Sequence, residues 1–233
     1  MLILVLNCGS SSIKADLVDH HTAHVHHQLR VERVGDSERC SLTCGKQTRD
    51  LGASGGSHAE ALAAALPILL AELGSDEAIR GVGHRVVHGG ETFKASVRID
   101  DEVEAVLASL SSLAPLHNPA NLAGIRAARE LLPDVVHVAV FDTAFHSTIP
   151  RRARSYALPA DLTQKHSLRR YGFHGTSHQY VANRAARYLE ADVRDLRLIT
   201  CHLGNGASMA AVEYGRSIDT TMGMTPLEGL VMG

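Results

Sequence analysis

The first third of the chain alternates short apolar runs with polar turns. Residues 2–6 are a continuous run of branched apolar side chains, which is typical of a buried strand. An extended pattern resumes after the polar stretch 7–12, and Gly35 with Asp36 marks a later turn. We expect strands at residues 2–6, 13–18, 25–34 and 40–44. Because the connections are short, these strands should start the sheet as an antiparallel meander.

Helical periodicity begins at residue 57. Ser57 followed by Glu60 is a capping box that opens an Ala/Leu-rich helix over 57–73, in which Pro67 should introduce a kink and which Gly74 should end. The following pattern predicts a strand at 79–87, helices at 100–110 and 119–132, and a buried strand at 135–141. This alternation of strands and helices indicates an α/β fold.

A basic connection that starts at Pro150 is the expected domain boundary, which divides the chain into domains 1–150 and 151–233. Beyond it we expect a helix at 176–190 and strands at 196–201 and 207–212. The strand, glycine-containing turn and strand of residues 2–18 therefore recur near 196–213, which suggests two similar domains facing a cleft. The apolar end of the chain, GLVMG, makes the second domain look unfinished.

Composition narrows the class of protein. Of 233 residues, 45% are hydrophobic and 21% are charged, as in ordinary globular domains. The net charge of -2 gives no overall positive field that would recruit nucleic acid or an anionic membrane. We find no apolar stretch long enough to span a membrane, so we expect neither nucleic acid nor membrane as a partner. Four scattered cysteines fit a reducing cytosol.

Two turns carry candidate phosphate-binding groups. The turn from Asn7 to Ser12 combines an amide, a glycine and three hydroxyls, and Lys14 adds a nearby cation. The turn from His202 to Ser208 has two glycines around Asn205, which permit backbone approach to a phosphate. Each pattern also describes an ordinary hairpin, so both interpretations stay open for either turn alone.

Three further side chains stand where chemistry is expected. Arg85 lies among glycines at a strand end and offers a planar fork that matches a carboxylate or phosphate; the alternative is a surface cation. Asp142 follows the buried strand 135–141, where α/β proteins place functional groups, although an aspartate there can also cap the next segment. His174 precedes a helix whose N-terminus favours an anion, so it should face a bound phosphate.

Fifteen histidines raise the question of a metal site. His24 and His26 can share one strand face, and Cys40 and Cys44 can share another, but neither group has the further ligands that a metal site needs. Asp142 with His174 or His146 could form a metal-hydrolase pair, yet no motif of matching spacing supports it. We therefore favour solvated histidines, and we leave His84 and His88 as structural hydrogen-bonding groups.

Seven ordered motifs resemble the acetate kinases. They are NCGSSSIK, GHRVVHGGE, APLHNP, FDTAFH, YGFHGTSH, CHLGNGAS and DTTMGMTPLEGLVMG. The resemblance runs from residue 2 to residue 233, and only about 20–78 diverge. It implies the α/β fold of the actin-like ATPase superfamily, with a complete first domain and a truncated second domain around an ATP cleft.

The resemblance also implies the reaction and its residues. It implies magnesium-dependent, reversible transfer of the ATP γ-phosphoryl group to acetate, giving acetyl phosphate and ADP, in a cytoplasmic enzyme that is a homodimer when complete. The catalytic groups would be Asp142, His174 and Arg85, with Asn7 placing magnesium. Nucleotide-binding groups would be Ser10, Ser12, Lys14, His202, Leu203, Gly204, Asn205 and Gly206. The acetate pocket would consist of Arg85, Val87, Leu116, His117, Phe173 and Pro226.

The chain stops where the acetate kinases continue into a Thr-Arg-Ser-Gly segment with a second arginine, an adenosine-binding glycine motif and a late magnesium-binding glutamate. We therefore expect residues 1–233 alone to show no acetate kinase activity. The alternatives are a competent acetate, propionate or butyrate kinase, an inactive remnant, and a metal hydrolase. Phosphotransfer, binding without turnover, and metal content would separate them.

Overall fold

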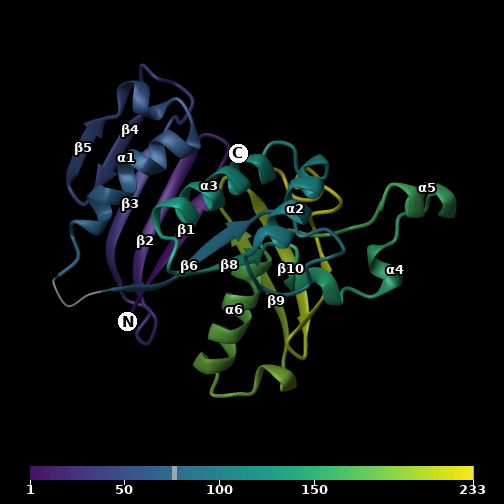
Figure 1. Cartoon of the computed structure of the whole chain (residues 1–233). Coiled ribbons are helices and arrows are strands. Elements are labelled where there is room, and N and C mark those ends of the chain that lie inside the picture. Colours follow the sequence, from purple (N-terminus) through teal and green to yellow (C-terminus); the bar gives the residue numbers. More distant parts are fainter. Residues whose placement is uncertain (75–77, 233) are drawn as a thin grey trace. The chain divides into compact units, whose positions relative to one another are not determined.

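A computed structural model describes residues 1–74 and 78–232. The described chain forms two compact units. The first unit contains Met1–Val86 and Val97–Val140, and the second contains Val87–Ser96 and Phe141–Gly233. The chain passes from the first unit to the second near residue 140, and the short segment after Val86 also groups with the second unit. Figure 1 follows these segments by colour.

The first unit is built on an eight-stranded sheet with the order β5-β4-β3-β2-β1-β6-β8-β7. Its strands are β1 (Leu2–Cys8), β2 (Ser12–Asp19), β3 (Val25–Glu32), β4 (Ser41–Cys44), β5 (Gln47–Asp50), β6 (Ile79–Val86), β7 (Val97–Arg98) and β8 (Val136–Phe141). β1 to β5 form the expected antiparallel meander, and β6 pairs parallel to β1. The apolar runs thus place β1 in the interior of the sheet.

Helices α1 (His58–Leu70) and α3 (Asn118–Leu131) pack against each other and contribute to the core of the first unit. Figure 1 shows both on one side of the sheet. The Ser57 hydroxyl accepts a hydrogen bond from the Glu60 amide, which confirms the predicted cap. Alternate residues of β1 point into the core, so the same strand presents Asn7 on its other face.

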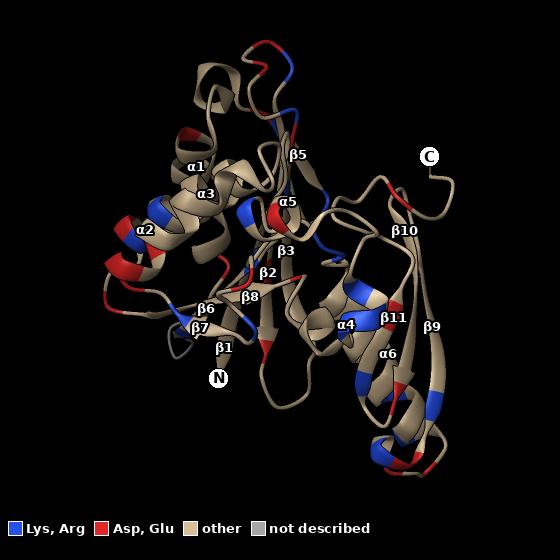
Figure 2. Cartoon of the chain, turned by 90° about the vertical axis from the view of Figure 1, so that its right-hand side faces the viewer, with Lys and Arg blue, Asp and Glu red and all other residues tan. Residues whose placement is uncertain are grey.

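The acidic helix α2 (Asp101–Ser109) is capped by Asp100, whose carboxylate accepts from the Val103 amide. Its first turn carries three further acidic residues, coloured red in Figure 2, which complement the positive end of the helix dipole. Arg126 and Arg129 of α3 form ion pairs with Glu104. These ion pairs link the two helices.

The second unit contains a three-stranded antiparallel sheet with the order β11-β10-β9. The strands are β9 (Arg197–Leu203), β10 (Ala207–Glu213) and β11 (Arg216–Thr220). Its α-helices are α4 (Arg151–Arg154), α5 (Ala160–Lys165) and α6 (Gly175–Tyr188), and α6 contacts β9. The meander β9-β10-β11 repeats the layout of β1-β2-β3, which confirms the predicted recurrence of a strand, turn and strand.

The longer predicted helices and strands are confirmed, with ends that differ by a few residues. The main differences are helix α1, which ends at Leu70 before the predicted stop at Gly74, and strand β3, which ends at Glu32 before the Gly35 turn. The pattern did not predict β5, β7, β11, α4 and α5. Each has six residues or fewer, which is too short to show a period. All four residues of β5 are also exposed, so no apolar pattern marks it.

Two features of the described residues bear on the expected class of protein. Within residues 1–74 and 78–232, no helix has the length and apolar character needed to cross a membrane. All four cysteines are free thiols, and burial raises the pKa of Cys8 to about 12.

Candidate functional site

The predicted groups of the first unit meet on one face of its sheet. Asn7 of β1 lies directly opposite Lys14 of β2, so their side chains share a face. Arg85 extends from β6, and its Nη1 donates to Asn7 Oδ1 at 3.2 Å. Lys14 is exposed, whereas Asn7 and Arg85 are half-buried. The parallel pairing of β1 with β6 therefore brings together an amide and a guanidinium that are 78 residues apart.

Side chains of two helices, α1 and α3, hold the turn between β1 and β2 in place. The Gly9 amide donates to the Ser12 carbonyl at 2.8 Å, which closes the turn. The His58 ring, at the start of α1, contacts the Gly9 carbonyl at 2.7 Å, and Asn121 Nδ2 of α3 donates to the Cys8 carbonyl at 2.6 Å. Ser10 stays exposed at the tip. The turn is thus anchored on its carbonyl side, and His58 and Asn121 are two anchoring residues that the motif analysis missed.

In the second unit, Asp142 is tied to the start of α6. It follows β8 and is buried. Its backbone carbonyl accepts from the Gly175 amide at 2.9 Å, and its Oδ1 accepts from the Thr176 hydroxyl at 3.2 Å. A side chain on Gly175 would overlap the Asp142 carbonyl, so only glycine allows this approach. The two predicted motifs, FDTAFH and YGFHGTSH, therefore meet.

His174 occupies the N-cap of α6 in a left-handed conformation, with φ of 58°. This is an uncommon conformation for a residue with a side chain. Its Nδ1 lies 2.9 Å from Ser208 Oγ of β10, and its ring stacks on that of His202 with 4.0 Å between centroids. His202 Nδ1 in turn lies 2.9 Å from Ser177 Oγ. The structure thus brings His174 and the predicted turn 202–206 together in one unit.

Two further histidines of the second unit, His178 and His146, are buried. His178 of α6 contacts Ser208 Oγ through Nε2 and Thr200 Oγ1 through Nδ1, each at 2.8 Å. His146 contacts Ser217 Oγ at 2.7 Å and the Phe173 carbonyl at 2.9 Å. Burial lowers the pKa of each ring to about 4, so both are neutral near pH 7.

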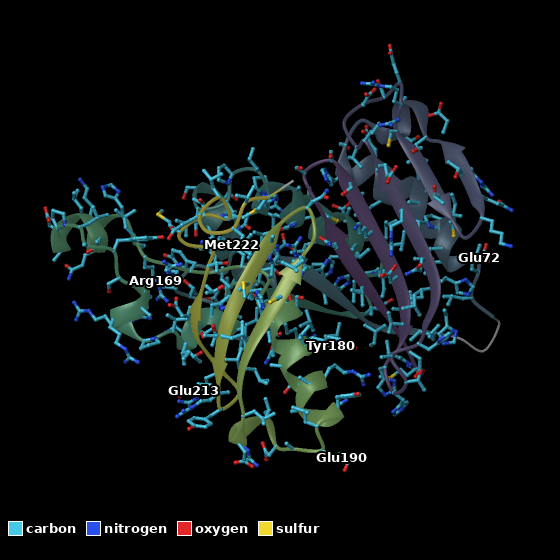
Figure 3. All side chains as sticks on the ribbon, turned by 180° about the vertical axis from the view of Figure 1, so that it is seen from behind. Glu72, Arg169, Tyr180, Glu190, Glu213 and Met222 are labelled. Carbon is cyan, nitrogen blue, oxygen red and sulfur yellow. The ribbon has the colours of Figure 1, made fainter. Side chains whose placement is uncertain are left out.

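A small apolar cluster contains two of the predicted acetate-pocket residues. Val87, Phe173 and Met222 are all buried and pack together, with Met232 against them. Figure 3 labels Met222 beside the strands of the second unit. Pro226 is half-buried in the same unit. Met222 was missed as a member of the cluster because a methionine among polar residues gives no periodic signal.

The other predicted pocket residues lie in the first unit. Leu116 is 74% exposed, and His117 occupies the N-cap position of α3. Of the two motif histidines assigned to structure, His84 Nε2 lies 2.9 Å from His137 Nδ1, and His88 Nδ1 accepts from the Gly90 amide at 2.9 Å. These contacts confirm the structural assignment of both histidines.

The described residues do not form a metal cage. In residues 1–74 and 78–232, no group of three or more His, Cys, Asp or Glu is arranged to hold a metal ion. The amide oxygen of Asn7, the predicted magnesium ligand, accepts from the cationic Arg85. Magnesium commonly keeps waters and binds through substrate phosphates, so a single amide oxygen would suit an ion that arrives with a nucleotide.

Four hydrogen-bonding residues of the second unit lie in or beside the predicted motifs, which gave them no role of their own. Ser208 and Thr200 stand in and just before CHLGNGAS, while Thr176 and His178 belong to YGFHGTSH. Their roles depend on contacts between β9, β10 and α6, because each hydrogen-bonds a partner more than 20 residues away. Local patterns carry no information about such partners.

The known proteins that this chain resembles are acetate and propionate kinases. Acetate kinase of Thermotoga maritima is 51% identical over 238 aligned positions, which cover 100% of this chain and 59% of the relative. The crystal structure of Porphyromonas gingivalis acetate kinase matches with a TM-score of 0.89 at 45% identity, covering 99% of this chain and 59% of the other. A propionate kinase from Francisella tularensis matches with a TM-score of 0.91 at 44% identity over the same shares.

The chain thus spans about three fifths of the length of the curated relatives it matches. Its α/β fold is that of these acetate and propionate kinases. Residues 2–233 match the acetokinase family, and the chain belongs to that family.

Proposed function

We propose that the protein to which this chain belongs is an acetate kinase, which transfers the γ-phosphoryl group of ATP to acetate reversibly. The observation that supports this most strongly is the acetokinase match across residues 2–233, with 51% identity to the Thermotoga maritima enzyme. The substrates would be acetate and magnesium-bound ATP. We include magnesium as part of the nucleotide substrate, with Asn7 as an oxygen ligand that the chain could offer.

The proposed roles follow from what phosphoryl transfer needs. Its transition state is loose, and the protein contributes mainly positioned donors around the equatorial oxygens of the transferring group. Arg85 would hold the acetate carboxylate or the transferring phosphoryl group through its planar fork. His174 would donate to an equatorial oxygen. The turns at 7–12 and 202–206, with Lys14, would bind the nucleotide phosphates.

Asp142 would orient groups and not remove a proton. Acetate is already ionised at pH 7, so it needs no base to become a nucleophile. The contacts of Asp142 with Gly175 and Thr176 support a role in holding the start of α6. A helix start held in this way presents its backbone amides toward an anion.

Propionate is the second substrate to consider, because one matched structure is a propionate kinase. The residues Val87, Phe173 and Met222 favour the smaller acid, since all three are buried and pack together. One methylene in an apolar pocket changes specificity by only about 1–3 kcal/mol, so propionate should be a poorer substrate that is still used.

The remaining proposals concern the complete protein. We propose actin-like domains at 1–150 and 151–233, a homodimer, and a cytoplasmic location. The four free cysteines support a reducing compartment. A clear dimer in solution would support the proposed homodimer. Secretion of the protein with oxidised thiols would contradict the cytoplasmic location.

The test is formation of acetyl phosphate, trapped with hydroxylamine. Two proteins are assayed with ATP, magnesium and acetate: residues 1–233, and a chimera in which the same residues precede the C-terminal part of Thermotoga maritima acetate kinase that they do not match. We expect turnover in the chimera and none in residues 1–233.

His174→Ala and Asp142→Asn serve as matched variants of the chimera. The proposal is supported if both variants lose the turnover of the chimera. For His174→Ala, we expect kcat to fall more than the acetate KM rises. A folded chimera that binds ATP without forming acetyl phosphate would contradict it. Turnover by residues 1–233 alone would show that this part is a sufficient enzyme.

A further inference from the structure

Arg170 binds the backbone of the segment that carries Met222. Its Nη1 donates to the carbonyls of three successive residues, at 2.6 Å for Thr220 and at 3.3 Å for Thr221 and Met222. Strand β11 ends at Thr220, so these carbonyls lie where the chain leaves the sheet. The Arg170 side chain is 21% exposed, and hydrogen bonds from a charged donor are stronger than those between neutral groups.

The carboxylate of Glu228 binds Arg170 from further along the same segment. Its Oε1 accepts from Arg170 Nη2 at 3.1 Å, and its Oε2 accepts from the Tyr156 hydroxyl at 2.6 Å. The Tyr156 oxygen also accepts from the Met224 amide at 2.8 Å. The direction of each bond is fixed, because guanidinium and backbone amide groups only donate and a tyrosine hydroxyl has a single proton. The guanidinium of Arg170 is thus held in one orientation.

Gly223 lets Glu228 and Tyr156 approach the backbone closely. A side chain at this position would overlap Glu228 Oε2 and the Tyr156 hydroxyl, so only glycine leaves room for both oxygens. The Gly223 carbonyl accepts from the amides of the two residues after Arg170, each at 3.1 Å. Side-chain and backbone contacts therefore fix the same short segment.

Met222 is the residue of this segment that reaches the candidate site. It is buried and packs with Val87 and Phe173. A side chain built on Gly206 would lie 4.0 Å from the Met222 methyl carbon and 3.2 Å from the His174 ring. The end of the Met222 side chain therefore lies beside the predicted phosphate-binding turn, at one side of the proposed acetate pocket.

We propose that Arg170, oriented by Glu228 and Tyr156, is a positioning residue that sets the size of the apolar acid pocket by holding the backbone at Met222. Methionine has three rotatable bonds and adapts to the space around it, so by itself it discriminates weakly between acids of different length. Holding its backbone removes part of this freedom. The role deepens the proposed function and rests on it, because the apolar cluster binds acetate only if the protein is an acetate kinase.

The other charged groups beside Arg170 do not orient it in this way. Asp219 Oδ1 lies 3.9 Å from Arg170 Nε, beyond hydrogen-bond length, and its side chain is 59% exposed, so this ion pair should contribute little. Arg169 pairs with Glu91 at 3.0 Å. Glu228 is therefore the carboxylate that orients the guanidinium.

The propionate-to-acetate ratio of kcat/KM in the chimera tests the effect on specificity. Arg170→Gln should raise this ratio about threefold to tenfold, because one methylene in an apolar pocket is worth about tenfold or more and a loosened Met222 gives up part of that. Arg184→Gln is the matched control, since Arg184 is exposed on α6, and it should leave the ratio unchanged. A general loss of stability would lower both rates together. An unchanged ratio in folded Arg170→Gln would overturn the proposal.

A second substitution, Glu228→Gln, tests whether the carboxylate acts through Arg170. It should raise the ratio by a smaller factor, and the double variant should match Arg170→Gln alone, because the two side chains act as one unit. Effects that multiply would contradict the orienting role of Glu228. The Glu228 side chain is 42% exposed, so if Arg170→Gln fails to fold, an unchanged ratio in Glu228→Gln would overturn the proposal.

Methyl NMR of residues 1–233 tests the hold on Met222 without any turnover. The methionine methyl groups are labelled with carbon-13, and the signal lost in Met222→Leu identifies Met222. Its resonance depends on the nearby Phe173 ring, so Arg170→Gln should shift or broaden it, whereas the signal of Met1 in the first unit should stay unchanged.

A Met222 signal that stays in place in folded Arg170→Gln would overturn the proposal, whether or not the protein is a kinase. A chimera without any turnover would refute the proposed function, and the NMR result would then decide whether Arg170 holds Met222.

Discussion

The Arg85 side chain is held by a contact with the neighbouring strand β1. Its guanidinium extends from β6 and donates to Asn7 of β1. The same planar group can bind a carboxylate or phosphate through two parallel hydrogen bonds, which a lysine ammonium cannot reproduce. In the proposed role of Arg85, we therefore expect the shape of the side chain to matter more than its charge.

At this residue we predict that Arg85→Lys is nearly as harmful as Arg85→Ala. In the active chimera, each change should lower kcat/KM about a hundredfold, the effect of losing about 3 kcal/mol of transition-state stabilisation. Acetyl phosphate formation measures it, and Lys14→Arg, which keeps a cation on the same face, serves as a control. Near-normal turnover in Arg85→Lys would contradict the proposed bidentate role.

A substitution of Val87 tests whether the apolar cluster forms the acetate pocket. Val87→Ala removes two methyl groups that pack with Phe173 and Met222. The kcat/KM ratio of propionate to acetate should rise, by up to about tenfold, because the space for one methylene is enlarged. Measured ratios for both acids check this. A ratio that stays constant, or a preference of the unchanged protein for butyrate, would remove Val87 from the pocket.

At the scale of elements, the start of α6 depends on a close backbone approach. The Gly175 amide donates to the Asp142 carbonyl at 2.9 Å, and a side chain at this position would overlap that carbonyl. The start of α6 would have to move away from Asp142 to accept one. The position of His174 depends on the same contact because it directly precedes Gly175.

We therefore predict that Gly175→Ala lowers the free energy of unfolding by about 2–3 kcal/mol, although alanine is the better helix former. Urea unfolding measures the change. Gly83→Ala is the matched control, since no atom lies within 4 Å of the added side chain there. Equal stability of the two variants would show that the approach to Asp142 is not strained by a side chain.

At the scale of the molecule, buried neutral histidines couple stability to pH. Burial lowers the pKa of His84 to about 3 and those of His88, His146 and His178 to about 4. The unfolded chain binds protons at these rings below about pH 6.5, whereas the folded chain does not. Their contribution is complete above pH 6.5 and is lost as the pH falls toward 4.

We predict that the melting temperature is constant from about pH 8 to 7 and falls steeply below about pH 6.5. Each ring contributes on the order of 3 kcal/mol to this loss, so acid unfolding should be complete before about pH 4. Thermal unfolding followed by circular dichroism measures it. The slope should persist at high salt, which screens surface charges only. A flat profile down to pH 5 would contradict the prediction.

The second unit also presents an apolar strand face. Ile199 and Leu203 of β9 are 66% and 76% exposed, and Cys201 lies exposed between them. The three side chains alternate along the strand and so share one face. Among the described strands, β9 is at an edge of its sheet. Uncovered apolar faces beside strand edges favour association.

We predict that residues 1–233 self-associate at micromolar concentration and that Ile199→Glu reduces this. Light scattering across a concentration series measures the mass. Tyr180→Glu is the matched control, because Tyr180 is 64% exposed on α6, where Figure 3 labels it, and it does not belong to this face. A monomer at all concentrations, or equal effects of both changes, would contradict the prediction.

The sequence predicted the longer elements because their signals are local. The apolar run of β1, the Ser57 cap of α1 and the run that forms β8 each fix one element without reference to the rest of the chain. The seven motifs also located Asp142, Arg85 and His174 by resemblance. The short elements β5, β7 and α5 escaped prediction because they contain too few residues to show a period.

Only the tertiary structure decided which of these residues meet. The parallel pairing of β1 with β6 brings Arg85 to Asn7, and the approach of Gly175 to the Asp142 carbonyl joins two motifs. The hydrogen-bond partners of His174 and His178 come from β9 and β10, at distances in sequence where no pattern repeats. Periodicity reports whether a side chain is buried, whereas its partner depends on which elements pack together. The chemical types of the site residues were therefore set by the sequence, and their contacts by the packing.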